Sequence, residues 1–120
     1  MQILLVDDNS DIRSTLSTFL RRKGHEVQAC QSAIEAWSSL SLNDYELVLT
    51  DVRMPRMGGV ELARKMRESG SNTPIIFMAG APEEELQDAQ AVLGPYSVLQ
   101  KPFMLNALID ELSRAVPGQV

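Results

Sequence analysis

The sequence predicts a single α/β domain in which a parallel sheet of five strands is covered by helices on both faces. Short runs of apolar or β-favouring residues alternate along the chain with stretches whose apolar residues recur at helical spacing. The alternation spans 120 residues without repeats, low-complexity tracts or an interdomain linker, and this length suits one domain with one core. Alternating elements of this kind favour parallel strands joined by right-handed crossovers.

The first two units each consist of a short strand followed by an amphipathic helix. Ile3–Val6 is wholly apolar, as expected of a strand buried on both faces. An acidic loop over residues 7–11 leads into a helix that ends at Gly24, with inward positions at Ile12, Leu16, Phe19 and Leu20. His25–Cys30 is the second predicted strand, and the helix after it carries Ala33, Ile34, Trp37 and Leu40.

The third unit delivers one acid to the end of a buried strand. Leu47–Thr50 runs without a charge into Asp51, and a Pro and two Gly residues then break the chain. Gly58 and Gly59 open a helix whose inward residues are Val60, Ala63 and Met66. By itself Asp51 is equally consistent with a ligand-binding residue and with an Asp that caps a turn.

The last two units repeat the pattern. Pro74–Met78 is the fourth predicted strand, and Gly80, Ala81 and Pro82 open a helix whose first turn holds Glu83, Glu84 and Glu85. Tyr96–Leu99 is the fifth strand, residues 101–103 form a turn, and the last helix carries Leu105, Leu108, Ile109, Leu112 and Val116.

Composition restricts the class of function. The net charge of −5 leaves the chain without the basic stripe of a nucleic-acid-binding protein, so no direct nucleic-acid binding is expected. Cys30 is the lone cysteine and cannot form an internal disulfide, which suits a reducing compartment. The apolar run at the N-terminus is too short for a signal peptide or a membrane span, so we expect a cytoplasmic protein without membrane association.

Strands one, three, four and five of such a sheet end at the same edge, where ligands bind in open α/β folds. Asp7, Asp8, Asp51, Ala79 and Lys101 therefore converge there.

Three carboxylates at one edge require a positive partner. With waters and a backbone carbonyl they suit Mg²⁺, and Lys101 supplies a mobile positive charge. A carboxylate held ionised beside a metal and an ammonium group is able to attack an electrophilic phosphorus. The alternative for each residue alone is structural: Asp7 and Asp8 as a solvated helix cap, and Lys101 as a surface lysine.

Four motifs keep a common spacing along the chain: Val6-Asp7-Asp8-Asn9, Asp51-Val-Arg-Met-Pro-Arg-Met-Gly-Gly-Val-Glu-Leu62, Pro74-Ile-Ile-Phe-Met78 and Lys101-Pro102-Phe103. In these motifs the chain resembles the receiver domains of two-component response regulators, from Ile3 to about Ala115. The resemblance implies a (βα)5 flavodoxin-like, doubly wound sheet with strand order 2-1-3-4-5. It also implies one receiver domain over residues 1–120, with a core of about 2–116 and a tail or linker start at 117–120.

The resemblance implies a role for each residue of the cluster. Asp51 accepts a phosphoryl group from the phosphohistidine of a sensor histidine kinase or a histidine phosphotransfer protein. Asp8 is a ligand of Mg²⁺, Asp7 supports the metal directly or through water, and the backbone carbonyl of Arg53 completes the shell. Lys101 contacts the phosphoryl group, and its peptide bond to the following proline is often cis in the family.

Two positions depart from the family pattern. The fourth strand normally leads to Thr or Ser, where this chain has Ala79, and the aromatic residue expected three positions before the lysine is Val98. The missing hydrogen bond to the charged phosphoryl group is worth about 1.5 to 3 kcal/mol, which weakens the phosphorylated state but does not prevent phosphorylation of Asp51, because the metal and Lys101 remain. The conformational response is expected to be reduced or to take another route, since it depends on contacts that differ between the two states. Tyr96 lies on the same side of its strand as Val98 and is a candidate moving aromatic, with plain packing as the alternative.

The function expected is that of a phosphorelay receiver that regulates an output domain or effector protein. Its only chemistry is its own phosphorylation and slow hydrolysis, so it is not an enzyme acting on an external substrate. The main alternative is a receiver-like interaction module that works independently of phosphate. A flavodoxin-like nucleotide binder lacks support because the first loop is acidic, and an aspartate phosphatase because Arg53 stands where a second acid is needed. A homodimer, and continuation into a longer regulator, are left open.

Overall fold

The computed structural model describes residues 1–80 and 84–118, and within them five parallel strands form one sheet in the order β2-β1-β3-β4-β5. The predicted strand order is therefore confirmed. The strands are β1 (Gln2–Val6), β2 (Glu26–Cys30), β3 (Leu47–Asp51), β4 (Ile75–Ala79) and β5 (Tyr96–Gln100). Each boundary differs from the expected one by a residue at most, and Ala79 is the last residue of β4 rather than the first residue after it.

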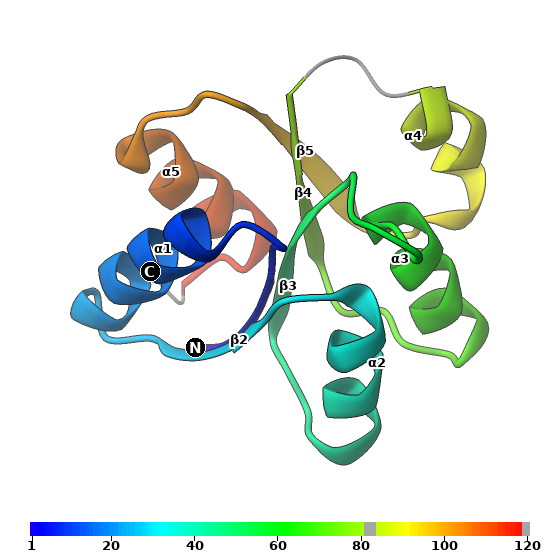
Figure 1. The fold of residues 1–120 in the computed structure, drawn as a ribbon, viewed down its shortest axis with the longest axis horizontal. Coiled ribbons are helices and arrows are strands. Elements are labelled where there is room, and N and C mark those ends of the chain that lie inside the picture. The colour runs from blue at the N-terminus through cyan, green and yellow to red at the C-terminus, as the bar shows by residue number, and fades with distance from the viewer. Residues whose placement is uncertain (81–83, 119–120) are drawn as a thin grey trace.

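Helices cover both faces of the sheet, with α1 and α5 on one face and α2, α3 and α4 on the other (Figure 1). They are α1 (Ser10–Arg22), α2 (Ala33–Leu42), α3 (Gly59–Glu68), α4 (Glu84–Ala89) and α5 (Leu105–Ala115). The predicted helix opening at Ala81, Pro82 and Glu83 lies outside the described residues. The described α4 is short and continues as a 3-10 turn over Gln90–Val92. None of the helices in the described part of the chain is long and apolar enough to cross a membrane.

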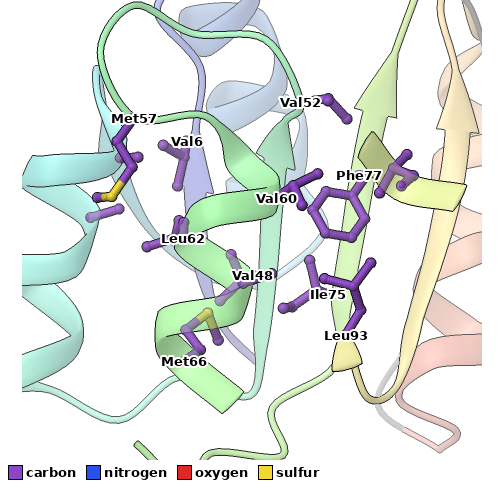
Figure 2. Packing of buried hydrophobic residues seen from close by; sticks show 14 of the residues in the cluster. Val6, Val48, Val52, Met57, Val60, Leu62, Met66, Ile75, Phe77 and Leu93 are labelled. Carbon is purple, nitrogen blue, oxygen red and sulfur yellow. The ribbon is translucent and has the colours of Figure 1, made fainter. Parts of the chain in front are cut away.

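Two apolar clusters, one on each face, hold the sheet between its helices. Along β3 and β4 successive side chains point to opposite faces, so Val48 and Phe77 belong to one cluster while Leu49 and Met78 belong to the other. Figure 2 shows part of the first cluster, where residues of α3 lie over the sheet. Because both faces of the central strands are covered, the ends of these strands are fixed in position.

The turn between β1 and α1 is organised by Asn9. Its side-chain oxygen accepts the backbone N–H groups of Asp11 and Ile12, both at 3.0 Å, and thereby caps the helix. This cap begins the helix at Ser10, two residues before the first apolar position from which the sequence pattern was read. The acidic pair before Asn9 therefore lies directly between the end of a buried strand and a capped helix.

The connection from β3 to α3 brings two backbone segments into direct contact. The N–H group of Gly59 donates to the Val52 carbonyl at 2.9 Å. A Cβ atom built on Gly59 would lie 2.2 Å from the carbonyl oxygen of Asp51, a distance that no real side chain tolerates. Glycine at this position lets the first turn of α3 pack against the backbone of Asp51.

Substituting Gly59 with alanine tests this contact. Because the new methyl group would displace the Asp51 carbonyl, Gly59→Ala is expected to lower the free energy of unfolding by about 2 kcal/mol or more in urea denaturation. Gly80→Ala is the matched control, since a Cβ atom there meets nothing within 4 Å. Equal stability of the two variants would contradict the packing role of Gly59.

Candidate functional site

The carboxyl ends of β1 and β3 bring three acidic side chains together. One carboxylate oxygen each from Asp7, Asp8 and Asp51 lies within 4.8 Å of the other two. Lys101 follows β5 and points into this group, with its Nζ atom 3.2 Å from Asp51 Oδ1 and 3.6 Å from Asp7 Oδ2. The structure thus brings together the four charged residues that the sequence predicted to converge.

Asp7 is the most buried member of the group. Its side chain has no exposed surface, and its Oδ1 atom accepts the Asn9 N–H group at 2.9 Å. Within the described part of the chain the Oδ2 atom has no hydrogen-bond partner, because the Lys101 contact at 3.6 Å is an ion pair too long for a hydrogen bond. A buried carboxylate oxygen that lacks a donor is costly, and this one is aimed into the cluster.

The pKa of Asp51 is subject to opposing effects from burial and from the neighbouring charges. Burial raises the pKa of its carboxyl above the ordinary value, since a charged group loses hydration there. The ammonium group of Lys101 opposes this shift and lowers the pKa, whereas the charges of Asp7 and Asp8 raise it further. An additional cation among the carboxylates would favour the ionised form of Asp51.

Lys101 is positioned by its backbone as well as by its charge. Its N–H group donates to the Ala79 carbonyl at 2.7 Å, which ties the end of β5 to the end of β4. The peptide bond to Pro102 is cis, as the resemblance implied. The Lys101 side chain is 23% exposed, so its ammonium group lies at the mouth of the site rather than inside the core.

The donor set fits Mg²⁺. The ion prefers hard oxygen ligands and usually keeps several waters, and the cluster offers a fully buried, an intermediate and an exposed carboxylate. The Oδ2 atom of Asp7, buried without a donor, is the kind of atom that a bound cation or its water would satisfy. Arg53 lies two residues after Asp51 in the loop. That its backbone carbonyl is a ligand of the metal stays a prediction.

The two atypical positions lie on the neighbouring strands β4 and β5. Ala79 is 3% exposed at the end of β4 and presents no hydroxyl, and Val98 on β5 is 42% exposed. The Tyr96 ring packs edge-on against Phe77, with ring centroids 5.8 Å apart and an interplanar angle of 69°. This contact favours the packing interpretation of Tyr96 over that of a moving aromatic.

Sequence reasoning did not predict the roles of two residues near the site. Arg13 donates from Nη1 to the carbonyl of Asp7 at 2.8 Å, and Gly59 packs on the Asp51 backbone. The signal for Arg13 was a positive charge near the start of a helix, where acids are favoured. Sequence reasoning assigned Gly59 only to the opening of a helix, because a close backbone approach leaves no residue pattern of its own.

Comparison with known proteins gives a consistent result. The family model of the response regulator receiver domain matches residues 3–113. A response regulator receiver protein of Brucella abortus, CpdR, is 33% identical over 113 residues, with 94% of each chain covered. The response regulator MprA of a Mycobacterium species is 32% identical over 112 residues, which cover 93% of this chain but 49% of that protein.

Solved structures agree with these relatives. The chemotaxis protein CheY4 of Vibrio cholerae superimposes with a TM-score of 0.88 at 30% sequence identity, and the match covers 96% of this chain and 98% of that one. The family model covers nearly the whole chain, and the sheet order and the acidic edge are those expected from the four motifs. The chain therefore belongs to the receiver domains of two-component response regulators.

Proposed function

We propose that this receiver domain accepts a phosphoryl group on Asp51 in the presence of Mg²⁺. The observation that carries the proposal is the cluster itself: Lys101 Nζ lies 3.2 Å from Asp51 Oδ1, and two further carboxylates lie within 4.8 Å of that acid. An ionised carboxylate next to a lysine and a divalent-cation site has the composition needed for phosphoryl transfer.

In the proposed reaction a carboxylate oxygen of Asp51 attacks the phosphorus of a phosphohistidine on a partner. The new O–P bond forms as the P–N bond breaks, and the electron pair of that bond stays on the imidazole of the partner. Lys101 shifts from Asp51 towards the transferred phosphoryl oxygens, and Asp7 and Asp8 would hold the metal ion. Bound Mg²⁺ would neutralise negative charge on the transferring group.

The phosphohistidine has to come from another protein. His25 is the only histidine of the chain, and it lies just before β2, at the opposite end of the strands from Asp51. Response regulators work with histidine kinases and output domains, and a histidine kinase or a histidine phosphotransfer protein is the donor that this chemistry requires. The chain spans about half of the mycobacterial regulator and nearly all of the Brucella protein, so both an attached and a separate output fit the proposal.

We propose that phosphorylation is coupled to an output more weakly than in receivers that have Thr or Ser at the position of Ala79 and an aromatic residue at that of Val98. Ala79 offers no hydroxyl to the phosphoryl group, and Val98 is too small to fill the space that a swinging ring would occupy. A ligand shifts a conformational equilibrium only through contacts that differ between the two states. Here the differing contacts are restricted to Lys101, the metal ligands and the backbone.

A second candidate function is a receiver that binds its partner independently of phosphate. It is favoured by the same two residues, because Ala79 and Val98 remove both groups that would report phosphorylation to the α4 and β5 side. The complete acidic cluster with Lys101 favours the first function. Partner binding that survives Asp51→Asn would select the second.

Phosphorylation at Asp51 is tested directly with a small phosphodonor such as acetyl phosphate. The wild-type chain is expected to gain the mass of one phosphoryl group with Mg²⁺ and to gain none when the metal is chelated. Lys101→Met should slow the reaction on the order of 100-fold, because a charge that stabilises the transferring oxygens is lost. Asp51→Asn should gain no mass, whereas the control Asp110→Asn, at an exposed position of α5, should react normally. Labelling of Asp51→Asn would refute the assignment.

The raised pKa of Asp51, caused first by burial and then by the neighbouring carboxylates, makes a prediction about stability. Since the folded-state pKa of Asp51 is raised, the folded chain binds more protons, and stability falls as the pH rises from the ordinary Asp pKa of about 3.9 through the folded-state value. Without Mg²⁺ at pH 7, Asp51→Asn should therefore have a higher urea midpoint than wild type, and the difference should vanish below about pH 3.9.

Added Mg²⁺ should stabilise the wild type and narrow this gap, since a ligand bound only by the folded state raises its stability. Asp110→Asn keeps the acidic cluster, so its urea midpoint should follow pH and Mg²⁺ as that of the wild type does. A wild-type chain whose stability ignores both pH and Mg²⁺ would contradict the electrostatic account of the site.

The response to phosphorylation is tested by amide NMR with Mg²⁺ and beryllofluoride, which mimics the phosphoryl group. In the wild type we expect shifts around Asp8, Asp51 and Lys101 and only small ones at Tyr96 and Val98. The double variant with Ala79→Thr and Val98→Tyr restores a hydrogen bond worth about 1.5 to 3 kcal/mol and a ring able to move, so its shifts should extend along β5. Wild-type shifts as extensive as those of the double variant would show that coupling takes another route.

A further inference from the structure

Arg13 stands where the helix alone would not place a cation. It is the fourth residue of α1, close to the helix N-terminus, where the macrodipole favours acids such as the neighbouring Asp11. Its side chain is nevertheless partly buried and runs back towards the start of the helix, as long helical side chains do. The placement costs helix stability, and a compensating contact lies outside the helix.

That contact is with the acidic turn. The Nη1 atom of Arg13 donates to the carbonyl oxygen of Asp7 at 2.8 Å, and the N–H group of Asp7 donates to the Cys30 carbonyl at 3.1 Å. The Asp7 carbonyl belongs to the peptide unit that joins Asp7 to Asp8. Rotation of this unit would change ψ of Asp7 and φ of Asp8, and with them the direction of the Asp8 side chain.

Asp8 depends on this restraint more than Asp7 does. Asp7 is fully buried, and its Oδ1 atom is held by the Asn9 N–H group at 2.9 Å. Asp8 is exposed, so core packing does not fix its carboxylate. The orientation of the peptide between the two acids therefore sets the direction in which the Asp8 side chain leaves the backbone relative to Asp51.

We infer that Arg13 is a positioning residue for divalent-cation binding: its hydrogen bond to the Asp7 carbonyl holds the Asp7–Asp8 peptide so that both carboxylates face Asp51. The inference rests on the proposed function, in which Asp7, Asp8 and Asp51 hold Mg²⁺. It adds a residue from outside the acidic cluster, one that touches neither the metal nor the phosphoryl group.

The charge and the hydrogen bond of Arg13 have opposite effects on Mg²⁺ affinity. As a charge alone, a guanidinium group near the site repels a divalent cation, so its removal would tighten binding. As a positioning group it preorganises the ligands, so its removal weakens binding. The sign of the change in affinity therefore separates the two roles.

The experiment is an amide NMR titration of the full chain with Mg²⁺ alone, followed at Asp8, Asn9 and Val52. Arg13→Gln is expected to weaken Mg²⁺ binding about tenfold, the lower end of the effect of losing a group that orients metal ligands. Arg13→Lys keeps a hydrogen-bond donor but not the planar guanidinium group, so its Mg²⁺ affinity should lie between those of the wild type and Arg13→Gln. Arg22→Gln removes the same charge from the last turn of the same helix and should bind Mg²⁺ as the wild type does.

A second readout separates metal binding from chemistry. With acetyl phosphate, Arg13→Gln should need a higher Mg²⁺ concentration for its half-maximal rate but reach the wild-type rate at saturating Mg²⁺. Urea unfolding without metal establishes that each variant is folded under the conditions of the titration.

Unchanged or tighter Mg²⁺ binding by Arg13→Gln would overturn the positioning role, as would equal weakening by Arg22→Gln. If the wild type itself fails to bind Mg²⁺, the proposed function fails first, so the two failures are distinguishable.

Discussion

Electrostatic repulsion among Asp7, Asp8 and Asp51 is the constraint that the rest of the site has to meet. At an effective dielectric constant of 20, two like unit charges 4 Å apart repel each other by about 4 kcal/mol. This energy is a large part of the stability of a small domain. Lys101 offsets part of it through ion pairs with Asp51 and Asp7. The remaining repulsion favours a divalent cation at the cluster. Burial, and after it the charges of Asp7 and Asp8, raise the pKa of the Asp51 carboxyl.

The fold can hold this arrangement because the strands behind it cannot move independently. Both faces of β1, β3 and β4 are buried under helices, so the ends of these strands are fixed relative to one another. Backbone contacts then refine the geometry: α3 begins against the Asp51 carbonyl at Gly59, and Lys101 is tied to the end of β4 through the Ala79 carbonyl. The side-chain contact from Arg13 to Asp7 acts on the β1–α1 turn, where Asp8 and Asn9 are exposed.

In the proposed function, reception of a phosphoryl group and transmission of a signal are separate requirements, and the residues of this chain suit the first better than the second. The charged residues that the chemistry needs are all present at one edge. The groups that would carry a change away from that edge are replaced by Ala79 and Val98, and the aromatic residue of β5, Tyr96, is packed against Phe77. A domain built in this way would show more of its response in the loops that carry the charges than in β5.

The sequence by itself determined the fold class, the strand positions and the convergence of Asp7, Asp8, Asp51 and Lys101, because apolar periodicity records burial and parallel strands end at a common edge. The strand order came from the resemblance and was confirmed by the structure, since periodicity does not encode which strands are neighbours. The start of α1 shifted to Ser10 because a cap, rather than the apolar pattern, sets that boundary. Only the tertiary structure revealed the roles of Gly59 and Arg13. Both act on backbone carbonyls of the site, and a carbonyl has the same chemistry in every residue. The sequence could therefore mark Arg13 as unusual near a helix N-terminus but could not identify the carbonyl that either residue contacts.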